Sequence, residues 1–99
     1  MKKLFISQPM RGKTDEEILV VRKQAIESAE KLVGEPLEVI DSFFQSAPAG
    51  AKPLWFLGKS LELLADADVV YFAPGWEEAR GCKIEHTCAV EYSIDRIEP

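Results

Sequence analysis

The sequence predicts an α/β protein built around a parallel sheet, and three features of the chain indicate this class. Two near-continuous apolar runs, LFIS at residues 4–7 and ADVVYF at residues 67–72, are typical of strands buried on both faces. Helical patterns lie between the apolar runs, and helical crossovers make neighbouring strands parallel. The length of 99 residues fits a single domain, residues 1–99, with a modest core.

The segment after the first strand predicts a helix with clear ends. Thr14 and Glu17 have the spacing of a capping box, and Gly34 closes the helical pattern as glycine does after a last turn. Apolar residues at helical spacing predict its buried face, which comprises Ile18, Val21, Ala25, Ala29 and Leu32. Strand, loop and helix together form the first half of a βαβ unit.

The middle of the chain predicts a second strand at residues 37–40 and a second helix from Pro53 to about Ala65. The core stripe of this helix is expected to comprise Leu54, Leu57, Leu61 and Leu64. A different face of the helix is also apolar and holds Trp55, Phe56 and Leu63. Two interpretations of this second face stay open, cover by the loop from Phe43 or contact with another subunit.

The last third of the chain predicts a helix that starts near Gly81 and a short edge strand at residues 94–97. The polar face of the helix is expected to hold Lys83, His86 and Thr87. The opposite stripe is expected to hold Gly81, Cys88, Ala89 and Tyr92, with Glu85 in its middle. Because a carboxylate is costly to bury unless something pairs with it or uses it, Glu85 is the best candidate for chemistry.

Three loops are expected to surround Glu85, because ligands bind beyond the carboxyl ends of the strands in such sheets. These loops are residues 7–13, 41–44 and 73–81. Arginine and glycine stand side by side in two of them, as Arg11 with Gly12 and Arg80 with Gly81, which suits a phosphate group. Aromatic residues that could stack on a base or sugar are Phe5, Phe43 and Trp76.

This combination predicts a site for a phosphorylated or nucleoside-like sugar, which Glu85 attacks or stabilises. An alternative stays open, in which both arginines are solvated and Glu85 is the buried partner of one of them. Cys82 and His86 also suggest a metal site or a Cys–His dyad, but zinc sites usually bring more ligands. We therefore expect no metal, and no motif predicts a cofactor.

Charge and composition narrow the classes of partner. The net charge of −5 argues against nucleic acid, and no stretch is long and apolar enough to span a membrane. The apolar run at the start is too short for a signal-peptide core. Two cysteines without an export signal predict reduced thiols and a cytoplasmic protein.

Three segments, LFISQPMRG, ADVVYF and RGCKIEHTCAV, resemble the nucleoside 2-deoxyribosyltransferase superfamily over nearly the whole chain. Within it, the chain is most similar to a small, often phage-associated group of unknown function. The first segment also resembles the 2′-deoxynucleoside 5′-phosphate N-hydrolases. The resemblance implies a flavodoxin-like or Rossmann-like three-layer α/β/α fold with four parallel strands, or five, in the order 2-1-3-4. It further implies a homodimer or higher homo-oligomer with active sites at subunit boundaries.

The resemblance assigns roles to individual residues. Glu85, in the G-x-x-x-E of residues 81–85, matches a nucleophile that carries a deoxyribosyl intermediate. Met10, Arg11 and Gly12 match a loop that touches a 5′-phosphate in the hydrolases. The complete set of expected substrate-binding residues is Phe5, Ser7, Gln8, Pro9, Met10, Arg11, Gly12, Asp41, Phe43, Trp76, Arg80 and Gly81.

Two positions depart from the family pattern. Eight residues before Asp68, active members usually carry an aspartate, whereas this chain has Ser60, to which we assign the orientation of Glu85. Six residues before the nucleophile, Ala79 replaces an aspartate or serine. Carboxylates that could substitute are Glu77, Glu78 and Asp41.

Three functions follow as expectations. The first is an enzyme that cleaves or exchanges the N-glycosidic bond of a deoxynucleoside or its 5′-monophosphate, as a hydrolase or a deoxyribosyltransferase. The second is a non-catalytic nucleotide-binding module that uses the same pocket. The third is an oligomeric scaffold built on the face of Trp55, Phe56 and Leu63.

Overall fold

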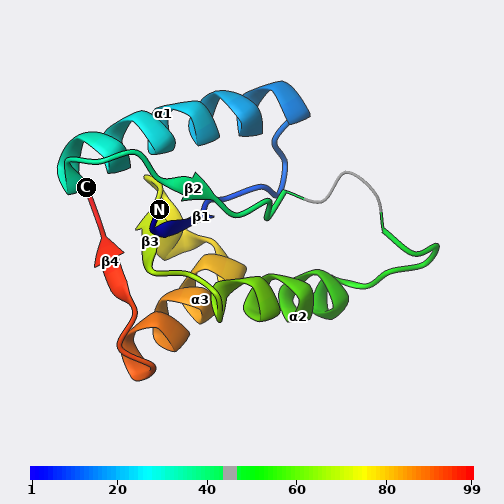
Figure 1. Ribbon diagram of the computed structural model, residues 1–99. Helices are drawn as coiled ribbons and strands as arrows, with labels where there is room; N and C mark the ends of the chain where they lie inside the picture. The colour runs from blue at the N-terminus through cyan, green and yellow to red at the C-terminus, as the bar shows by residue number, and fades with distance from the viewer. Residues whose placement is uncertain (44–46) are drawn as a thin grey trace.

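The protein has the alternating order of strands and helices that the sequence predicts (Figure 1). The computed structural model describes residues 1–43 and 47–99. The elements in chain order are β1 (Lys3–Ser7), α1 (Asp15–Val33), β2 (Glu38–Val39), α2 (Pro53–Leu64), β3 (Val69–Phe72), the 3-10 helix η1 (Trp76–Glu78), α3 (Arg80–Glu91) and β4 (Asp95–Ile97). No described helix is long and apolar enough to cross a membrane.

The sheet confirms the predicted strand order and direction. Its four strands are all parallel and follow the order β2-β1-β3-β4. The central pair has the longest register, from Leu4 opposite Val69 to Ser7 opposite Phe72. The outer strand β2 is two residues long instead of the four expected, and no fifth strand occurs in the described residues. The deepest part of the sheet is therefore the pair β1 and β3.

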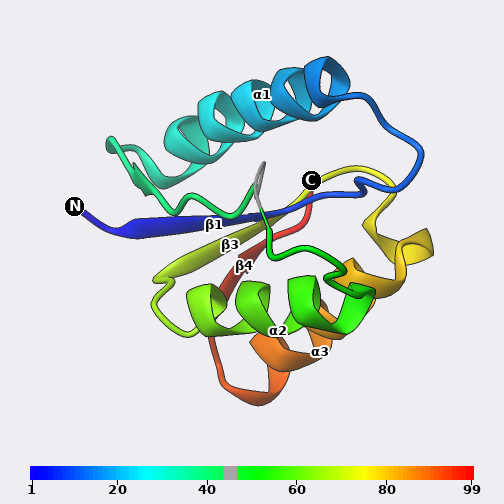
Figure 2. The same cartoon turned by 90° about the vertical axis from the view of Figure 1, so that its right-hand side faces the viewer.

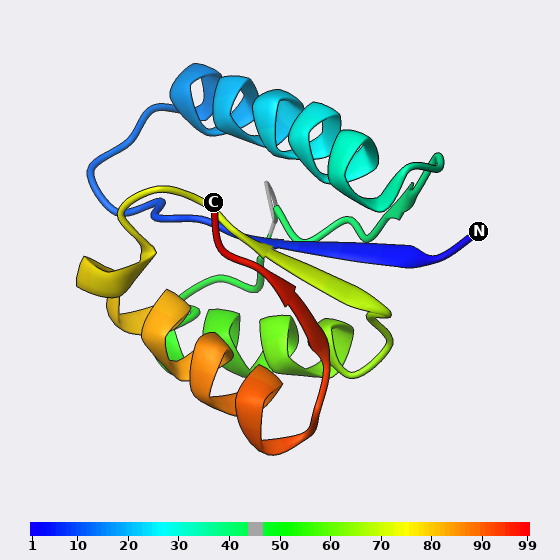
Figure 3. The ribbon, with the colours of Figure 1, turned by 90° about the vertical axis from the view of Figure 1, so that its left-hand side faces the viewer.

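Helices cover both faces of the sheet, which gives three layers. Figures 2 and 3 show α1 on one face, with α2 and α3 on the other. Side chains of β1 alternate between these layers, as they do in any strand. Leu4 and Ile6 belong to the core beneath α1, whereas Phe5 belongs to the core shared with α2 and α3. By the same alternation Ser7 points toward α3.

The ends of α1 confirm the predicted caps. The Thr14 side chain accepts from the Glu17 backbone N–H, and the Glu17 carboxylate accepts from the Thr14 backbone N–H. Gly34 adopts the left-handed conformation, φ 83°, and its N–H donates to the Glu30 carbonyl. The predicted buried face is wrong at Leu32, which is 64% exposed. The buried stripe passes through Arg22 instead, together with Ile18, Ala25 and Ala29.

The predicted core stripe of α2 is largely wrong. Only Leu64 is buried, Leu57 and Leu61 are half-buried, and Leu54 is 77% exposed. The physical reason is placement, because Figure 1 shows the first turns of α2 projecting beyond the strands.

Two residues of the apolar surface of α2, Leu54 and Phe56, are open to solvent. Residues 47–50 are themselves exposed. Trp55 and Phe56 pack edge to face at 5.1 Å between ring centroids, and Phe56 is 37% exposed. Phe44, part of the expected loop 41–44, lies outside the described residues. The interpretation that the loop from Phe43 covers this face depends on residues that include 44–46, so it lies partly outside the described residues.

Two leucines on α2 provide a matched test of this placement. We expect Leu64→Ala to lower the free energy of unfolding by about 2–5 kcal/mol, because it opens a cavity in the core. Leu54→Ala should cost less than about 0.5 kcal/mol, because the side chain is already in water. Urea denaturation of both variants measures the difference, and equal losses would contradict the placement of α2.

Candidate functional site

The centre of the site is a buried hydrogen bond between β1 and α3. Glu85 is 7% exposed and shares the inner stripe of α3 with Cys82 and Ala89. Ser7, the last residue of β1, is 1% exposed, and its hydroxyl donates to Glu85 Oε1 at 2.7 Å. The burial of Glu85 confirms the prediction that this carboxylate lies on the apolar stripe of the helix. The expected stripe is wrong at Gly81 and Tyr92, which are exposed.

Burial governs the ionisation of Glu85. Loss of water raises its pKa from 4.5 to about 7, and the hydrogen bond from Ser7 opposes this rise. Near neutral pH the side chain therefore exchanges readily between the acid and the carboxylate. A carboxyl group with this property suits proton transfer or nucleophilic attack.

Cys82 lies in the same environment but has no comparable reactivity. The pKa of its thiol is raised to about 11. Burial is the main cause, the hydrogen bond with Ser7 opposes the rise, and the charge of Glu85 adds to it. The side chain is therefore a neutral thiol at physiological pH, and a thiol is a weak nucleophile. Among the described residues, no group of three or more His, Cys, Asp or Glu side chains could hold a metal ion.

The Ser7–Glu85 pair lies where the strand order reverses. The chain leaves β1 for β2 on one side and later returns to β3 on the other, and Ser7 pairs with Phe72 at the end of β3. The Ala73 N–H then donates to the Ser7 carbonyl at 2.9 Å. Such reversal points beyond the carboxyl ends of strands are where doubly wound sheets bind their ligands.

Ser60 makes no hydrogen bond to Glu85 in the described part of the chain. It is half-buried on α2, and the hydrogen bond that Glu85 receives comes from Ser7. Ala79 is the N-cap residue of α3 and makes no side-chain capping bond. The serine that orients Glu85 is thus on the first strand, where its alternation with Phe5 was the signal that pointed it toward α3.

The loop after β1 lies partly at the surface. Pro9 and Met10 are half-buried, whereas Arg11 and Gly12 are exposed. A turn closes the loop through a bond from the Lys13 N–H to the Met10 carbonyl at 3.0 Å, and Gly12 has φ +77°. Arg11 is therefore a solvated cation at the rim, not a buried partner of Glu85.

The other predicted binding residues are spread between rim and core. Asp41, Arg80 and Gly81 are exposed, and Phe43 is half-buried. Phe5 is 1% exposed within the core, so the expectation that it stacks on a ligand is wrong.

Trp76 already has an aromatic partner within the chain. Its ring stacks on His86 with 4.2 Å between centroids and 18° between planes, and Phe72 packs against both rings. His86 also pairs with Glu98, which follows β4. The expectation that His86 lies on the polar face is confirmed only in part, because the side chain is half-buried, at 23% exposure. One face of Trp76 is thus taken by His86.

Sequence reasoning missed one buried charge, that of Arg22 on α1. Arg22 is 8% exposed and reaches the residues that follow β2. The signal was its spacing, four residues after Ile18 and three before Ala25, which places it on the buried stripe. Glu85 also lies on the apolar stripe of its helix. The same pattern, a charged residue at a buried position of an amphipathic helix, therefore marks both residues.

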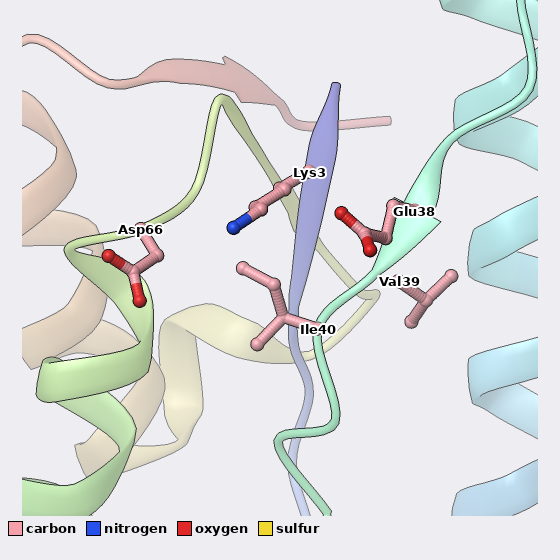
Figure 4. Close-up of a pocket in the computed structure, with 5 residues that line it drawn as sticks. All are labelled: Lys3, Glu38, Val39, Ile40 and Asp66. Atoms are coloured by element: carbon pink, nitrogen blue, oxygen red, sulfur yellow. The ribbon is translucent and has the colours of Figure 1, made fainter. Parts of the chain in front are cut away.

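Neither of two open cavities formed by described residues is lined by Glu85. The first, about 190 Å³, is lined by Lys3, Glu38, Val39, Ile40 and Asp66 near the start of β1. Figure 4 shows Lys3 and Ile40 on the α2 side of the sheet and Val39 turned toward α1. The second cavity lies along the edge strand β4.

The raised pKa of Glu85 predicts a pH-dependent cost to stability. The folded protein holds this proton up to about pH 7, whereas the unfolded chain releases it near 4.5. Stability from this group is therefore lost as pH rises between these values, and the loss is complete above pH 7. We expect Glu85→Gln to become more stable than the wild type as pH rises, by roughly 3 kcal/mol at most.

Urea denaturation at several pH values across this range measures the effect. Glu91→Gln, the same change at an exposed position of α3, is the matched control and should follow the wild-type profile. A stability difference between Glu85→Gln and the wild type that stays constant with pH would contradict the buried, protonated state.

Comparison with known proteins gives one result. No curated protein matches the chain. Residues 2–96 match a family described as a domain of unknown function (DUF4406). Because the match covers nearly all of the sheet and every helix, the chain belongs to this family.

Proposed function

We propose that the protein cleaves the N-glycosidic bond of a deoxynucleoside or its 5′-monophosphate, with Glu85 as the nucleophile. The observation that carries the proposal is the Ser7–Glu85 hydrogen bond at the reversal point of the sheet. A buried carboxylate with an oriented oxygen is what attack at a sugar carbon requires. Glu85 belongs to α3, and its carboxylate is held by Ser7 at the end of β1.

The proposed reaction has two steps that balance. One carboxylate oxygen of Glu85 bonds to C1′ of the sugar as the bond to the base nitrogen breaks, and the base leaves with the electron pair and gains a proton from solvent. Water, or the nitrogen of a second base, then attacks C1′ and releases the carboxylate. The first outcome is a hydrolase and the second a deoxyribosyltransferase.

Similarity to the nucleoside 2-deoxyribosyltransferase superfamily supports this chemistry as a proposal. The supporting segments are the loop after β1, the strand β3 and the start of α3. Ser7 gives the carboxylate a neutral hydrogen bond donor, which compensates in part for the aspartate that Ser60 replaces. Arg11 and Gly12 at the rim are available to a phosphate group.

Release of free base tests the catalytic proposal. Purified protein incubated with each deoxynucleoside 5′-monophosphate should liberate the base, detected by chromatography. Glu85→Ala should reduce the rate by a factor on the order of 1,000 or more, as loss of a nucleophile does. The matched control Glu91→Ala removes a carboxylate from the exposed face of the same helix and should leave the rate unchanged.

The pH dependence of the rate adds a second criterion. Because only the ionised form attacks, the rate should rise as pH increases toward and through about 7. Ser7→Ala removes the donor that favours the carboxylate and should shift this rise to higher pH. Base release at wild-type rates by Glu85→Ala would remove Glu85 as the nucleophile.

A second candidate function is a nucleotide-binding module without turnover. The observation in its favour is that Glu85 is only 7% exposed, which limits the access of a substrate to its carboxylate, whereas Arg11 and Gly12 are exposed. Deoxynucleotides that raise the melting temperature without release of base would favour this alternative over the enzyme.

We also propose that a second copy of the chain covers the open face of α2. The face presents Leu54 at 77% and Phe56 at 37% exposure. A small domain gains stability when such a face is buried. The same contact would serve the scaffold function if the protein neither binds nor cleaves nucleotides.

Sedimentation of the purified protein tests this assembly. We expect a dimer or larger species in the wild type and a shift toward monomer in Leu54→Lys, because the charge would be buried at the contact. Lys59→Ala, at an exposed salt bridge on the same helix, is the control and should leave the mass unchanged. A monomeric wild type would contradict the proposed contact.

We propose that the protein is cytoplasmic, because its cysteines are not joined in a disulfide. Cys82 is buried and Cys88 half-buried, and both are free. Free thiols are typical of proteins in reducing compartments.

A further inference from the structure

The buried guanidinium of Arg22 has no carboxylate partner in the described part of the chain. Its Nη1 donates to Ser42 Oγ at 3.3 Å and its Nη2 to the Ile40 carbonyl at 3.2 Å. Both acceptors are neutral, and no ion pair involves Arg22 among residues 1–43 and 47–99. Asp41 lies near enough for its charge to be felt but is exposed to solvent.

An unpaired buried cation is energetically unfavourable, so this arrangement calls for an anion. Arginine is rarely this deeply buried without a charged partner. Burial lowers the pKa of Arg22, which expresses the same cost. The guanidinium carries five N–H donors, and the two bonds to Ile40 and Ser42 occupy only part of them.

A second buried polar side chain, which bonds to α1 one turn before this arginine, has an acceptor atom without a partner. Gln8 is 5% exposed, and its Nε2 donates to the Ile18 carbonyl at 3.1 Å. Its Oε1 is buried and accepts no hydrogen bond from the described residues. Ile18 is one helical turn before Arg22 on α1, so the amide and the guanidinium follow the same inner stripe of the helix.

The place of these groups in the fold supports a binding role. α1 runs back along β1, so its first turns stand over the carboxyl ends of β1 and β2 (Figure 2). Side chains of a helix lean toward its N-terminus, which carries Arg22 toward that edge. The first turn of α1 carries three carboxylates, those of Asp15, Glu16 and Glu17, so the helix end itself is not the anion site.

We propose that Arg22, Ser42 and Gln8 form a subsite for a phosphate group at the carboxyl edge of β1 and β2. Arg22 donates to the anionic oxygens in the forked geometry that suits phosphate. Gln8 Oε1 accepts from a protonated phosphate oxygen, which gives the orphaned acceptor its donor. The subsite binds phosphate whether or not Glu85 cleaves a substrate, so it does not depend on the proposed reaction.

Titration of the full chain with inorganic phosphate tests the subsite. We expect a saturable rise in melting temperature, and binding followed by calorimetry at about pH 6, where phosphate is protonated. Arg22→Met, which fills the same buried space without charge, should weaken binding by a factor on the order of 10 to 100. Lys23→Gln removes an exposed cation from the same helix and should bind phosphate as the wild type does.

Sulfate separates the two parts of the site, because it is a tetrahedral anion with at least the charge of phosphate but has no proton to donate at this pH. The wild type should bind sulfate more weakly than phosphate, and Gln8→Met should remove that preference. No saturable response to phosphate, or wild-type affinity in folded Arg22→Met, would overturn the subsite. Equal affinity of the wild type for the two anions would overturn the role of Gln8.

A spectroscopic measurement keeps the test independent of the stability of the variants. The Nε–H resonance of Arg22 in the wild-type protein should shift on addition of phosphate, with the affinity found by calorimetry. A resonance that stays unchanged at saturating phosphate would place the anion elsewhere and contradict the proposal.

Discussion

The hydrogen bond from Ser7 to Glu85 is the interaction on which the arrangement of the site depends. It joins the last residue of the central strand to the inner face of the last helix, across almost the whole sequence. A carboxyl group in that position is costly to bury, and one short hydroxyl bond offsets only part of the cost. As a result, the pKa of Glu85 is about 7. A core that served packing alone would not need such a carboxyl group.

Adjacent residues at the end of β1 place polar side chains on both faces of the sheet. Ser7 serves the α3 layer, whereas Gln8 bonds to α1, and Arg22 bonds to the chain after β2. Both faces of the sheet therefore carry a buried group of high polarity at the carboxyl edge, while apolar residues fill the body of the core. This distribution separates a stabilising interior from an edge suited to ligands.

Local patterns predicted most of the fold correctly, and the errors follow from one cause. Caps depend on neighbours in sequence, so the ends of α1 at Thr14 and Gly34 were predictable. The burial of Leu54 and Leu32 was not, because helical spacing identifies an apolar stripe but not how far the sheet extends beneath it. The contacts of Ser7, Arg22 and His86 join distant segments, and residue spacing alone carries no information about such partners.

The sequence by itself determined the α/β class, the positions of the elements and the presence of an anomalous carboxylate at residue 85. These follow from the period of apolar residues and from the chemistry of turns and caps, which act over a few residues. Only the tertiary structure decided that Ser7 is the donor to Glu85, that Ser60 is not, and that Arg22 is buried beside neutral acceptors. The reason is that partners and burial are set by the packing of layers, where each side chain meets residues far away in the chain.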